Sequence, residues 1–216
     1  MIVYVIFYSG FRAATVTAKL DIIRKYLYDF VNVAAYDDDK IREILNDPKM
    51  IKNSRKIQAC VKNARTFMDT VRDYGSFQKF VDSYAPRESF ENLMLLKEDL
   101  EYRFKGLGEV TTYHVLTDIG MPVIKPDRVI CRIFKRLGLI DNDGQLLKTV
   151  IQSRKFAQAT RHPIRYIDTV FVSYGQMESR ELGITRGICL EERPSCSLCG
   201  VKNYCNYYAQ KYAVRQ

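Results

Sequence analysis

Apolar residues recur every three or four positions along most of the chain, which is the spacing of amphipathic helices, whereas the alternation typical of a half-buried strand is weak throughout. Asp37, Asp38 and Asp39 together favour a helix start, because the helix dipole stabilises negative charge there. We therefore predict an all-α protein. The expected helices cover residues 2–8, 14–30, 38–45, 51–74, 77–84, 89–102, 110–119, 127–137, 150–160, 164–178 and 204–212.

The first eleven residues are apolar, and Arg12 is the first charged residue of the chain. No stretch reaches the roughly 18–20 uncharged apolar residues that a membrane span needs. No small-residue cleavage site follows a basic start, as a signal peptide requires. The sequence therefore predicts a buried first helix, no membrane contact and a cytoplasmic location.

The chain is strongly basic, with 34 lysines and arginines against 25 acids, a net charge of +9 and an isoelectric point near 9.2. Such a charge makes a polyanionic partner a candidate, and nucleic acid is the commonest one. A solvated basic surface explains the charge equally well, so charge alone leaves the partner open.

A glycine-rich corner lies between two of the predicted helices, after Phe104. Two glycines spaced i, i+2 permit a tight turn and leave the backbone uncovered, so that amides at the next helix start can bind a phosphate. An ordinary helix–turn–helix corner is the alternative interpretation. The candidate DNA-contacting residues are Lys105, Gly106, Leu107, Gly108, Glu109, Val110 and Thr111.

Four of the six cysteines lie close together near the C-terminus, with the spacing C-x6-C-x2-C-x5-C. Four thiolates in one short loop can bind zinc or a [4Fe–4S] cluster. Zinc ribbons usually pair two C-x2-C units, and this loop has one; a disulfide scaffold is disfavoured because no secretory signal is present. The candidate metal ligands are Cys189, Cys196, Cys199 and Cys205, whereas Cys60 and Cys131 are expected in the core.

The hairpin is followed by Gly120-Met121-Pro122 and then by Asp127, which opens an apolar helix. In this order of motifs the chain resembles the helix-hairpin-helix glycosylases of the endonuclease III superfamily. The resemblance implies that Asp127 is the catalytic carboxylate, although an aspartate there can also be a simple N-cap. The cysteine spacing resembles that of the iron–sulfur loop in endonuclease III and the adenine-mismatch glycosylases, which implies a [4Fe–4S] cofactor.

The N-terminal half carries a second resemblance. Residues 8–16 and 33–68, and residues 51–59 most closely, look like the bacterial 3-methyladenine DNA glycosylase I family. The two resemblances together imply a two-lobed, monofunctional glycosylase that flips a damaged base out of double-stranded DNA. They favour an alkylated purine; a deaminated or mismatched base, such as hypoxanthine or uracil, is the runner-up, and a non-catalytic DNA-binding protein is the rival outside enzymes.

The chain departs from bifunctional members of the superfamily at Val110. Those members carry a lysine two residues after the second hairpin glycine, and its amine attacks the sugar to cut the strand. Valine has no nucleophilic amine. We therefore predict base removal without strand cleavage.

Candidates for the base pocket or for a wedge that fills the gap are Tyr8, Phe11, Arg12 and Tyr113, because aromatic faces stack on extruded bases. A buried phenylalanine in a helix–helix turn is an equally good interpretation of Phe11. We expect a monomer associated with the nucleoid. Its expected parts are a helical lobe at 1–120 with the hairpin at about 98–119, a second lobe at 121–188 and the cluster loop with a last helix at 189–216.

Overall fold

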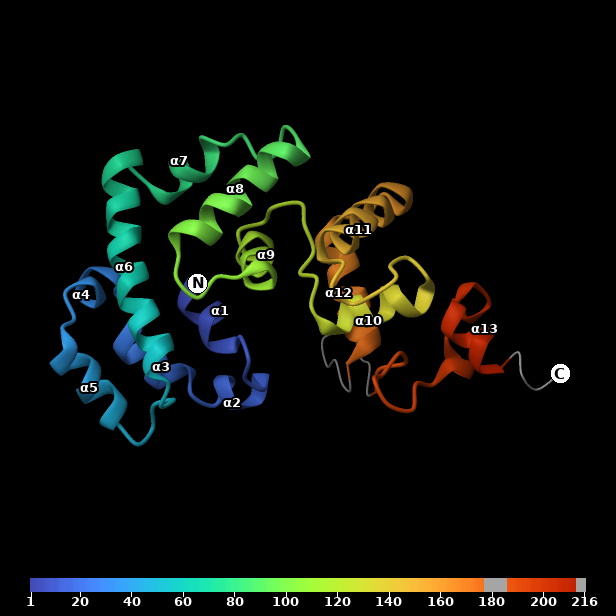
Figure 1. Ribbon diagram of the computed structural model, residues 1–216, viewed down its shortest axis with the longest axis horizontal. Coiled ribbons are helices and arrows are strands. Elements are labelled where there is room, and N and C mark those ends of the chain that lie inside the picture. The colour runs from blue at the N-terminus through green and yellow to red at the C-terminus, as the bar shows by residue number, and fades with distance from the viewer. Residues whose placement is uncertain (177–185, 213–216) are drawn as a thin grey trace. The chain divides into compact units, whose positions relative to one another are not determined.

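The computed structural model describes residues 1–176 and 186–212, and every regular element in these residues is a helix (Figure 1). The prediction of an all-α protein is therefore confirmed. The chain divides into two compact units, Met1–Met121 and Pro122–Gln216. No helix in the described part of the chain is long and apolar enough to cross a membrane.

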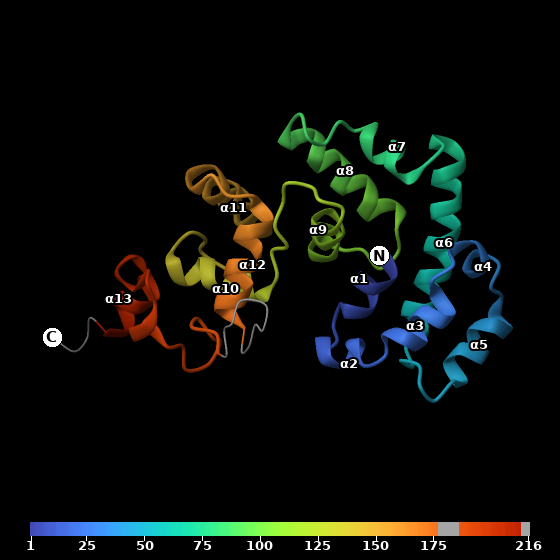
Figure 2. The same ribbon diagram turned by 180° about the vertical axis from the view of Figure 1, so that it is seen from behind.

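The N-terminal unit is built around one long helix, α6, against which α4 packs most extensively (Figures 1 and 2). The apolar faces of α1, α3, α4, α5 and α6 meet in a single core that includes the fully buried Phe7 and Ile57. The helices are α1 (Ile2–Tyr8), α2 (Ala13–Thr17), α3 (Leu20–Leu27), α4 (Phe30–Ala34), α5 (Asp38–Asn46), α6 (Ser54–Tyr74), α7 (Phe77–Asp82), α8 (Phe90–Arg103) and α9 (Glu109–Asp118).

The single helix expected over residues 14–30 is wrong, because the structure has α2, α3 and the start of α4 in that stretch. The break after α2 follows Thr15-Val16-Thr17, three β-branched residues with low helix propensity. At the second break, the Asp29 side chain accepts hydrogen bonds from the amides of Val31 and Asn32 and starts a new helix. The expected start at Asp37 is confirmed, since its carboxylate caps α5 at the amide of Lys40.

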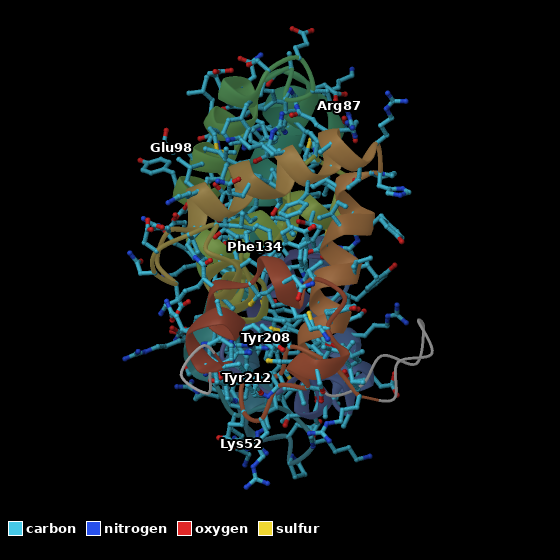
Figure 3. All side chains as sticks on the ribbon, turned by 90° about the vertical axis from the view of Figure 1, so that its right-hand side faces the viewer. Lys52, Arg87, Glu98, Phe134, Tyr208 and Tyr212 are labelled. Carbon is cyan, nitrogen blue, oxygen red and sulfur yellow. The ribbon has the colours of Figure 1, made fainter. Side chains whose placement is uncertain are left out.

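The C-terminal unit packs α10 and α11 against α12. The rings of Phe134 (labelled in Figure 3), Phe156 and Phe171 join the three helices, with centroids 5.0–5.9 Å apart. Helix α10 ends at Gly138, whose φ of +81° suits glycine, and a Cβ there would collide with Asn206 at the start of α13. The elements are α10 (Arg128–Leu137), α11 (Leu146–Thr160), α12 (Ile164–Gly175), the short 3₁₀ helices Cys196–Leu198 and Lys202–Tyr204, and α13 (Asn206–Tyr212).

The predicted bounds of the other helices differ from the observed ones by a few residues. Helix α6 begins at Ser54 because the Asn53 side chain caps it at the amide of Lys56. Helix α11 begins at Leu146, four residues before its predicted start. Helix α12 ends at Gly175, and residues 177 and 178 of the predicted helix lie outside the described residues.

Candidate active site and nucleic-acid interface

The glycine hairpin joins α8 to α9 in the N-terminal unit. Phe104 and Leu107 are buried and anchor the hairpin, while Gly106, between them, and Gly108, directly after Leu107, are exposed. Gly106 has a φ of +79°, a conformation that side chains disfavour. Gly108 has an extended backbone, so its role is different: nothing lies within 4 Å of the position of a Cβ, and its backbone is open to a partner.

Asn63 of α6 holds the hairpin in place. Its side-chain amide donates to the Lys105 carbonyl at 2.8 Å, and its side-chain oxygen accepts from the Lys105 amide at 2.7 Å. Asn63 is 5% exposed, so both bonds are shielded from water. The backbone of Lys105 is thus fixed and its exposed side chain is left available. The sequence reasoning missed Asn63, although a polar residue on the apolar face of a helix is a signal of such a role.

The start of α9 has fewer free backbone amides for an anion than the sequence led us to expect. The Gly108 amide is already used, because it donates to the Thr111 hydroxyl at 2.6 Å. The Thr112 hydroxyl donates to the Gly108 carbonyl at 2.9 Å. The next amides, starting at Glu109, belong to the first turn, whose N–H groups have no carbonyl within the helix. Val110 is half-buried in this turn, and the exposed amine of the hairpin is that of Lys105.

Asp127 is the N-cap of α10 in the C-terminal unit. Its Oδ1 accepts from the amides of Val129 at 2.9 Å and Ile130 at 3.2 Å, and its Oδ2 lies 3.5 Å from Lys125 Nζ. The side chain is 23% exposed. The carboxylate therefore uses one oxygen to start the helix and presents the other beside a lysine amine at the surface. Asp127 is therefore an N-cap, and capping leaves its Oδ2 available for other chemistry.

A second acid, Asp168 on α12, lies next to this segment, and the sequence reasoning missed it. Its Oδ2 accepts from Arg165 Nη1 at 2.9 Å, and its side chain is 9% exposed. Burial raises the pKa of Asp168 to about 6; the Arg165 charge opposes this shift, the Asp127 charge adds to it, and Lys125 lowers the pKa. The site thus contains two coupled carboxylates with one lysine and one arginine.

The four cysteines of the C-terminal loop, Cys189, Cys196, Cys199 and Cys205, line one small hollow of about 20 Å³. All four are free of disulfides. Among the described residues, no group of three or more histidines, cysteines or acids is close enough together to hold a single metal ion. Cys60 and Cys131 are 1% exposed in their helices, as expected of core residues.

Two arginines of α10 hold the cysteine loop. Arg136 donates to the Leu190 carbonyl at 2.6 Å, and its Nη1 lies 3.4 Å from Cys189 Sγ. Arg132 donates to the carbonyls of Gly175 and Cys189. Helix α10 therefore carries Asp127 at its first end and the cysteine loop at its last. The sequence analysis did not identify Arg132 and Arg136 as residues that hold the loop, although two arginines spaced i, i+4 on an apolar helix could have indicated such a role.

The structure places the candidate pocket and wedge residues in different environments. Tyr113 is 1% exposed and its hydroxyl contacts Met94 Sδ at 3.5 Å, which corrects the expectation that its ring is open to a base. Tyr8 is half-buried at the end of α1, and its hydroxyl lies 3.0 Å from that of Thr17. Phe11 and Arg12 lie together and exposed in the turn before α2. Phe11 is 36% exposed, so the interpretation as a buried turn residue is wrong.

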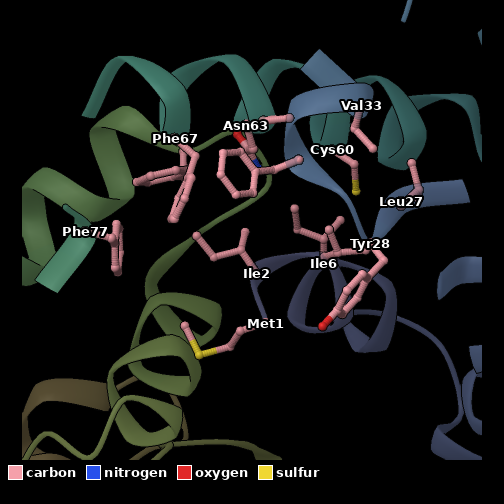
Figure 4. Close-up of a pocket in the computed structure, with 14 residues that line it drawn as sticks. Met1, Ile2, Ile6, Leu27, Tyr28, Val33, Cys60, Asn63, Phe67 and Phe77 are labelled. Atoms are coloured by element: carbon pink, nitrogen blue, oxygen red, sulfur yellow. The ribbon is translucent and has the colours of Figure 1, made fainter. Parts of the chain in front are cut away.

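A separate apolar cavity of about 330 Å³ lies between α1 and the long helix α6 (Figure 4). Its walls come from Met1, Ile6, Phe67 and neighbouring apolar side chains. Asn63 and Tyr28 are polar residues at its wall, and both ends of the Asn63 amide are engaged by Lys105. The cavity therefore contains none of the candidate residues inferred from the sequence.

The fold has a solved counterpart. The structure of a trapped endonuclease III–DNA covalent intermediate is 16% identical in sequence, superposes with a TM-score of 0.62, and covers 97% of this chain and 84% of that chain. At this identity the likeness shows the fold alone. The described part of the chain is all-helical, and the chain has the endonuclease III fold.

The family follows from the sequence of the N-terminal part. The sequence model of the methyladenine glycosylase family matches residues 1–131, more than half of the chain, and the chain belongs to that family. Two curated relatives are named endonuclease III: one from Rickettsia conorii (strain ATCC VR-613 / Malish 7), 27% identical over 107 residues, and one from Rickettsia prowazekii (strain Madrid E), 26% identical over 112 residues. The matches cover 49% and 51% of this chain, and 45% and 47% of the relatives, so the chain spans about half the length of the curated relatives it matches. Both resemblances inferred from the sequence are thereby confirmed.

Proposed function

We propose that the protein is a monofunctional DNA glycosylase, which hydrolyses the N-glycosidic bond of a damaged base and leaves an abasic site. The observation that carries the proposal is the Asp127 carboxylate, which caps α10 with Oδ1 and keeps Oδ2 at the surface beside Lys125. Membership of the methyladenine glycosylase family supports the same reaction.

The chemistry suits a carboxylate in this position. Breaking the N-glycosidic bond builds positive charge on the sugar, and a fixed negative charge stabilises that state. The same carboxylate can orient the attacking water or accept its proton. Because the two α10 amides hold Oδ1, the orientation of Oδ2 is fixed before the substrate arrives.

DNA binding is assigned to the hairpin. The amides of the first turn of α9 and the exposed amine of Lys105 together offer a phosphate both hydrogen bonds and positive charge. Phe11 and Arg12 are exposed in the α1–α2 turn and remain the proposed wedge. The net charge of +9 supports a duplex partner.

The four loop cysteines are proposed to hold a [4Fe–4S] cluster. Four free thiols around one hollow are the donor set of such a cluster, and the Arg136 guanidinium beside Cys189 Sγ suits a negatively charged group. The cluster would supply structural support by cross-linking the loop that α10 already holds.

The proposed substrate is an alkylated purine, on the ground of family membership. The fold is shared with endonuclease III, and this keeps deaminated or mismatched bases as the second candidates. Strand cleavage is not expected, because Val110 stands in the first turn of α9 where a lysine nucleophile would be needed.

The test is base excision by the anaerobically purified protein on duplexes that carry alkylated adenine, hypoxanthine, uracil or oxidised guanine. We expect strand breaks after alkali treatment alone, and no covalent complex with DNA after borohydride treatment. Breaks without alkali, or a trapped complex, would show that an amine does attack the sugar. Duplex binding without excision of any of these bases would favour the non-catalytic rival.

A further inference from the structure

Asp168 is a buried acid whose hydrogen bonding is incomplete. It is the fifth residue of α12, its side chain is 9% exposed, and its Oδ2 accepts from Arg165. Its Oδ1 is buried and accepts no well-formed hydrogen bond in the described part of the protein, although the backbone amide of Lys125 lies close enough to lower the pKa of the carboxyl. Burial of an unsatisfied carboxyl oxygen destabilises a fold, so a side chain needed only for packing would be apolar or fully bonded here.

The position of this acid relates it to Asp127. Helices α10 and α12 pack side by side (Figures 1 and 2), and this packing brings Asp168 against the Lys125–Asp127 segment that precedes α10. Asp127 and Lys125 are both near enough to act on Asp168 through their charges. Asp168 therefore lies close to the Lys125–Asp127 segment and is more deeply buried than Asp127, whose side chain is 23% exposed.

We propose that Asp168 is a positioning residue of the reaction proposed above: it is held by Arg165 close to the Lys125–Asp127 segment and places a second negative charge near the Asp127 carboxylate. The inference rests on the proposed function and deepens it. Two carboxylates stabilise positive charge on a sugar better than one, and the buried acid meets no solvent that would screen it. Asp168 acts through Asp127 and is not expected to touch the substrate.

The ionisation of Asp168 is what makes the proposal testable. Burial and the Asp127 charge both favour its neutral form and raise its pKa to about 6. Asp168 is neutral below that pH and carries a negative charge above it. Among the described residues, the nearby charged groups are Arg165 on α12 itself and Lys125 and Asp127 before α10. The elements packed against α12 also carry Arg132 on α10 and Arg154 on α11. The guanidinium groups of these two arginines donate to backbone carbonyls.

The experiment measures single-turnover excision by the anaerobically purified protein between pH 5 and pH 8. For the wild type we expect the rate to rise about tenfold through pH 6, the factor that a charge interaction of one pKa unit supplies. Asp168→Asn keeps the shape of the side chain but has no charge, so its rate should stay at the low-pH level across this range. A profile in Asp168→Asn with the same step as the wild type would overturn the proposal.

Histidine is the other side chain that ordinarily titrates in this range, so His162→Gln, just before α12, is the matched control and should keep the step. Circular dichroism and duplex binding of Asp168→Asn should equal those of the wild type, which separates a charge effect from misfolding. Loss of the helical signal would instead assign Asp168 to folding and contradict the positioning role.

A second measurement keeps the inference separate from the proposed function. The carboxyl carbon of Asp168 is followed by NMR in the wild type and in Asp127→Asn. Because the Asp127 charge raises the pKa of Asp168, we expect Asp168 to titrate at a lower pH in the variant. An unchanged midpoint would disprove the coupling whether or not any base is excised. A protein that excises no base but shows the shift would contradict the proposed function and leave the coupling in place.

Discussion

A single carboxylate at Asp127 has two uses, one for folding and one proposed for catalysis. Its Oδ1 satisfies two amides that α10 cannot bond internally, and its Oδ2 remains beside Lys125. The fold therefore fixes the direction of the free oxygen without any further side chain. Such an arrangement reduces the reorganisation that the reaction requires.

Asn63 has a comparable role for the hairpin, since one side chain fixes both backbone groups of Lys105. We expect Asn63→Ala to lower the free energy of unfolding by about 1–3 kcal/mol, because it leaves shielded backbone groups unpaired. Duplex binding should weaken at the same time, since the hairpin is released. Thermal unfolding and duplex titration measure the two effects.

The control for this prediction is Gln58→Ala, which removes an exposed side chain from the same helix. It should change neither quantity. Wild-type stability and affinity in Asn63→Ala would show that the two bonds contribute nothing to the hairpin.

At the residue scale the sequence was informative where a residue stands at a recognisable junction. Asp127 opens an apolar run after the glycine hairpin, and the resemblance of this order of motifs to the helix-hairpin-helix glycosylases identified it as a candidate. Asp168 and Asn63 stand inside helices, and their importance depends on which backbone or side chain another segment brings against them. Periodicity cannot supply such a long-range contact. The expectation that Tyr113 is open to a base was wrong for the same reason, because Met94 on α8 contacts its hydroxyl.

At the element scale, α10 links the proposed catalytic acid to the cysteine loop. Asp127 starts the helix, Arg132 and Arg136 hold the loop carbonyls, and the Arg136 guanidinium also lies 4.6 Å from the ring centre of Tyr207 on α13. Tyr208 and Tyr212 pack on each other along α13 (Figure 3). A group bound by the cysteines would therefore stabilise the far end of the helix that carries Asp127.

The cysteine assignment predicts a definite metal content. The anaerobically purified protein should contain four iron atoms and four acid-labile sulfides per chain, as the formula of the cluster requires. Cys199→Ser should lose most of both, because it removes one of four ligands. Elemental analysis and sulfide assay measure them.

Cys131→Ala is the matched control, since it removes a buried cysteine from the same unit at a distance from the loop ligands in sequence. It should retain the iron. One zinc and no iron in the wild type would contradict the assignment and leave the loop as a zinc site.

The helices themselves were predictable where their ends carry chemical signals. Asp37 and the glycine after α10 mark their ends in the sequence. The stretch 14–30 was misjudged because no glycine or proline interrupts it, and its apolar spacing continues across two breaks. Low helix propensity separates α2 from α3, and the Asp29 cap begins α4. Both signals are weaker in the sequence than the regular apolar spacing, which predicts one continuous helix.

At the scale of the whole molecule, the chain combines two patterns. The methyladenine glycosylase family accounts for residues 1–131, a stretch that ends within α10. The cysteine loop comes after that stretch, and the chain as a whole has the endonuclease III fold. The functional proposal therefore depends most on Asp127, which lies inside the family match and begins the helix that leads out of it.

The most direct test of the account is single-turnover base excision by Asp127→Asn on the substrate that the wild type cleaves. Asparagine caps helices about as well as aspartate, so the fold should be kept while the charge is lost. We expect the rate to fall by about 10²-fold or more, the loss typical of a removed transition-state contact. Duplex binding should be equal or tighter, because a negative charge near the phosphates is gone.

Asp143→Asn, which removes an exposed acid from the turn after α10, is the control and should excise at the wild-type rate. Loss of excision in Asp127→Asn alone, with binding preserved, is the result that the account predicts. Excision by Asp127→Asn at the wild-type rate would contradict it and reduce Asp127 to a helix cap.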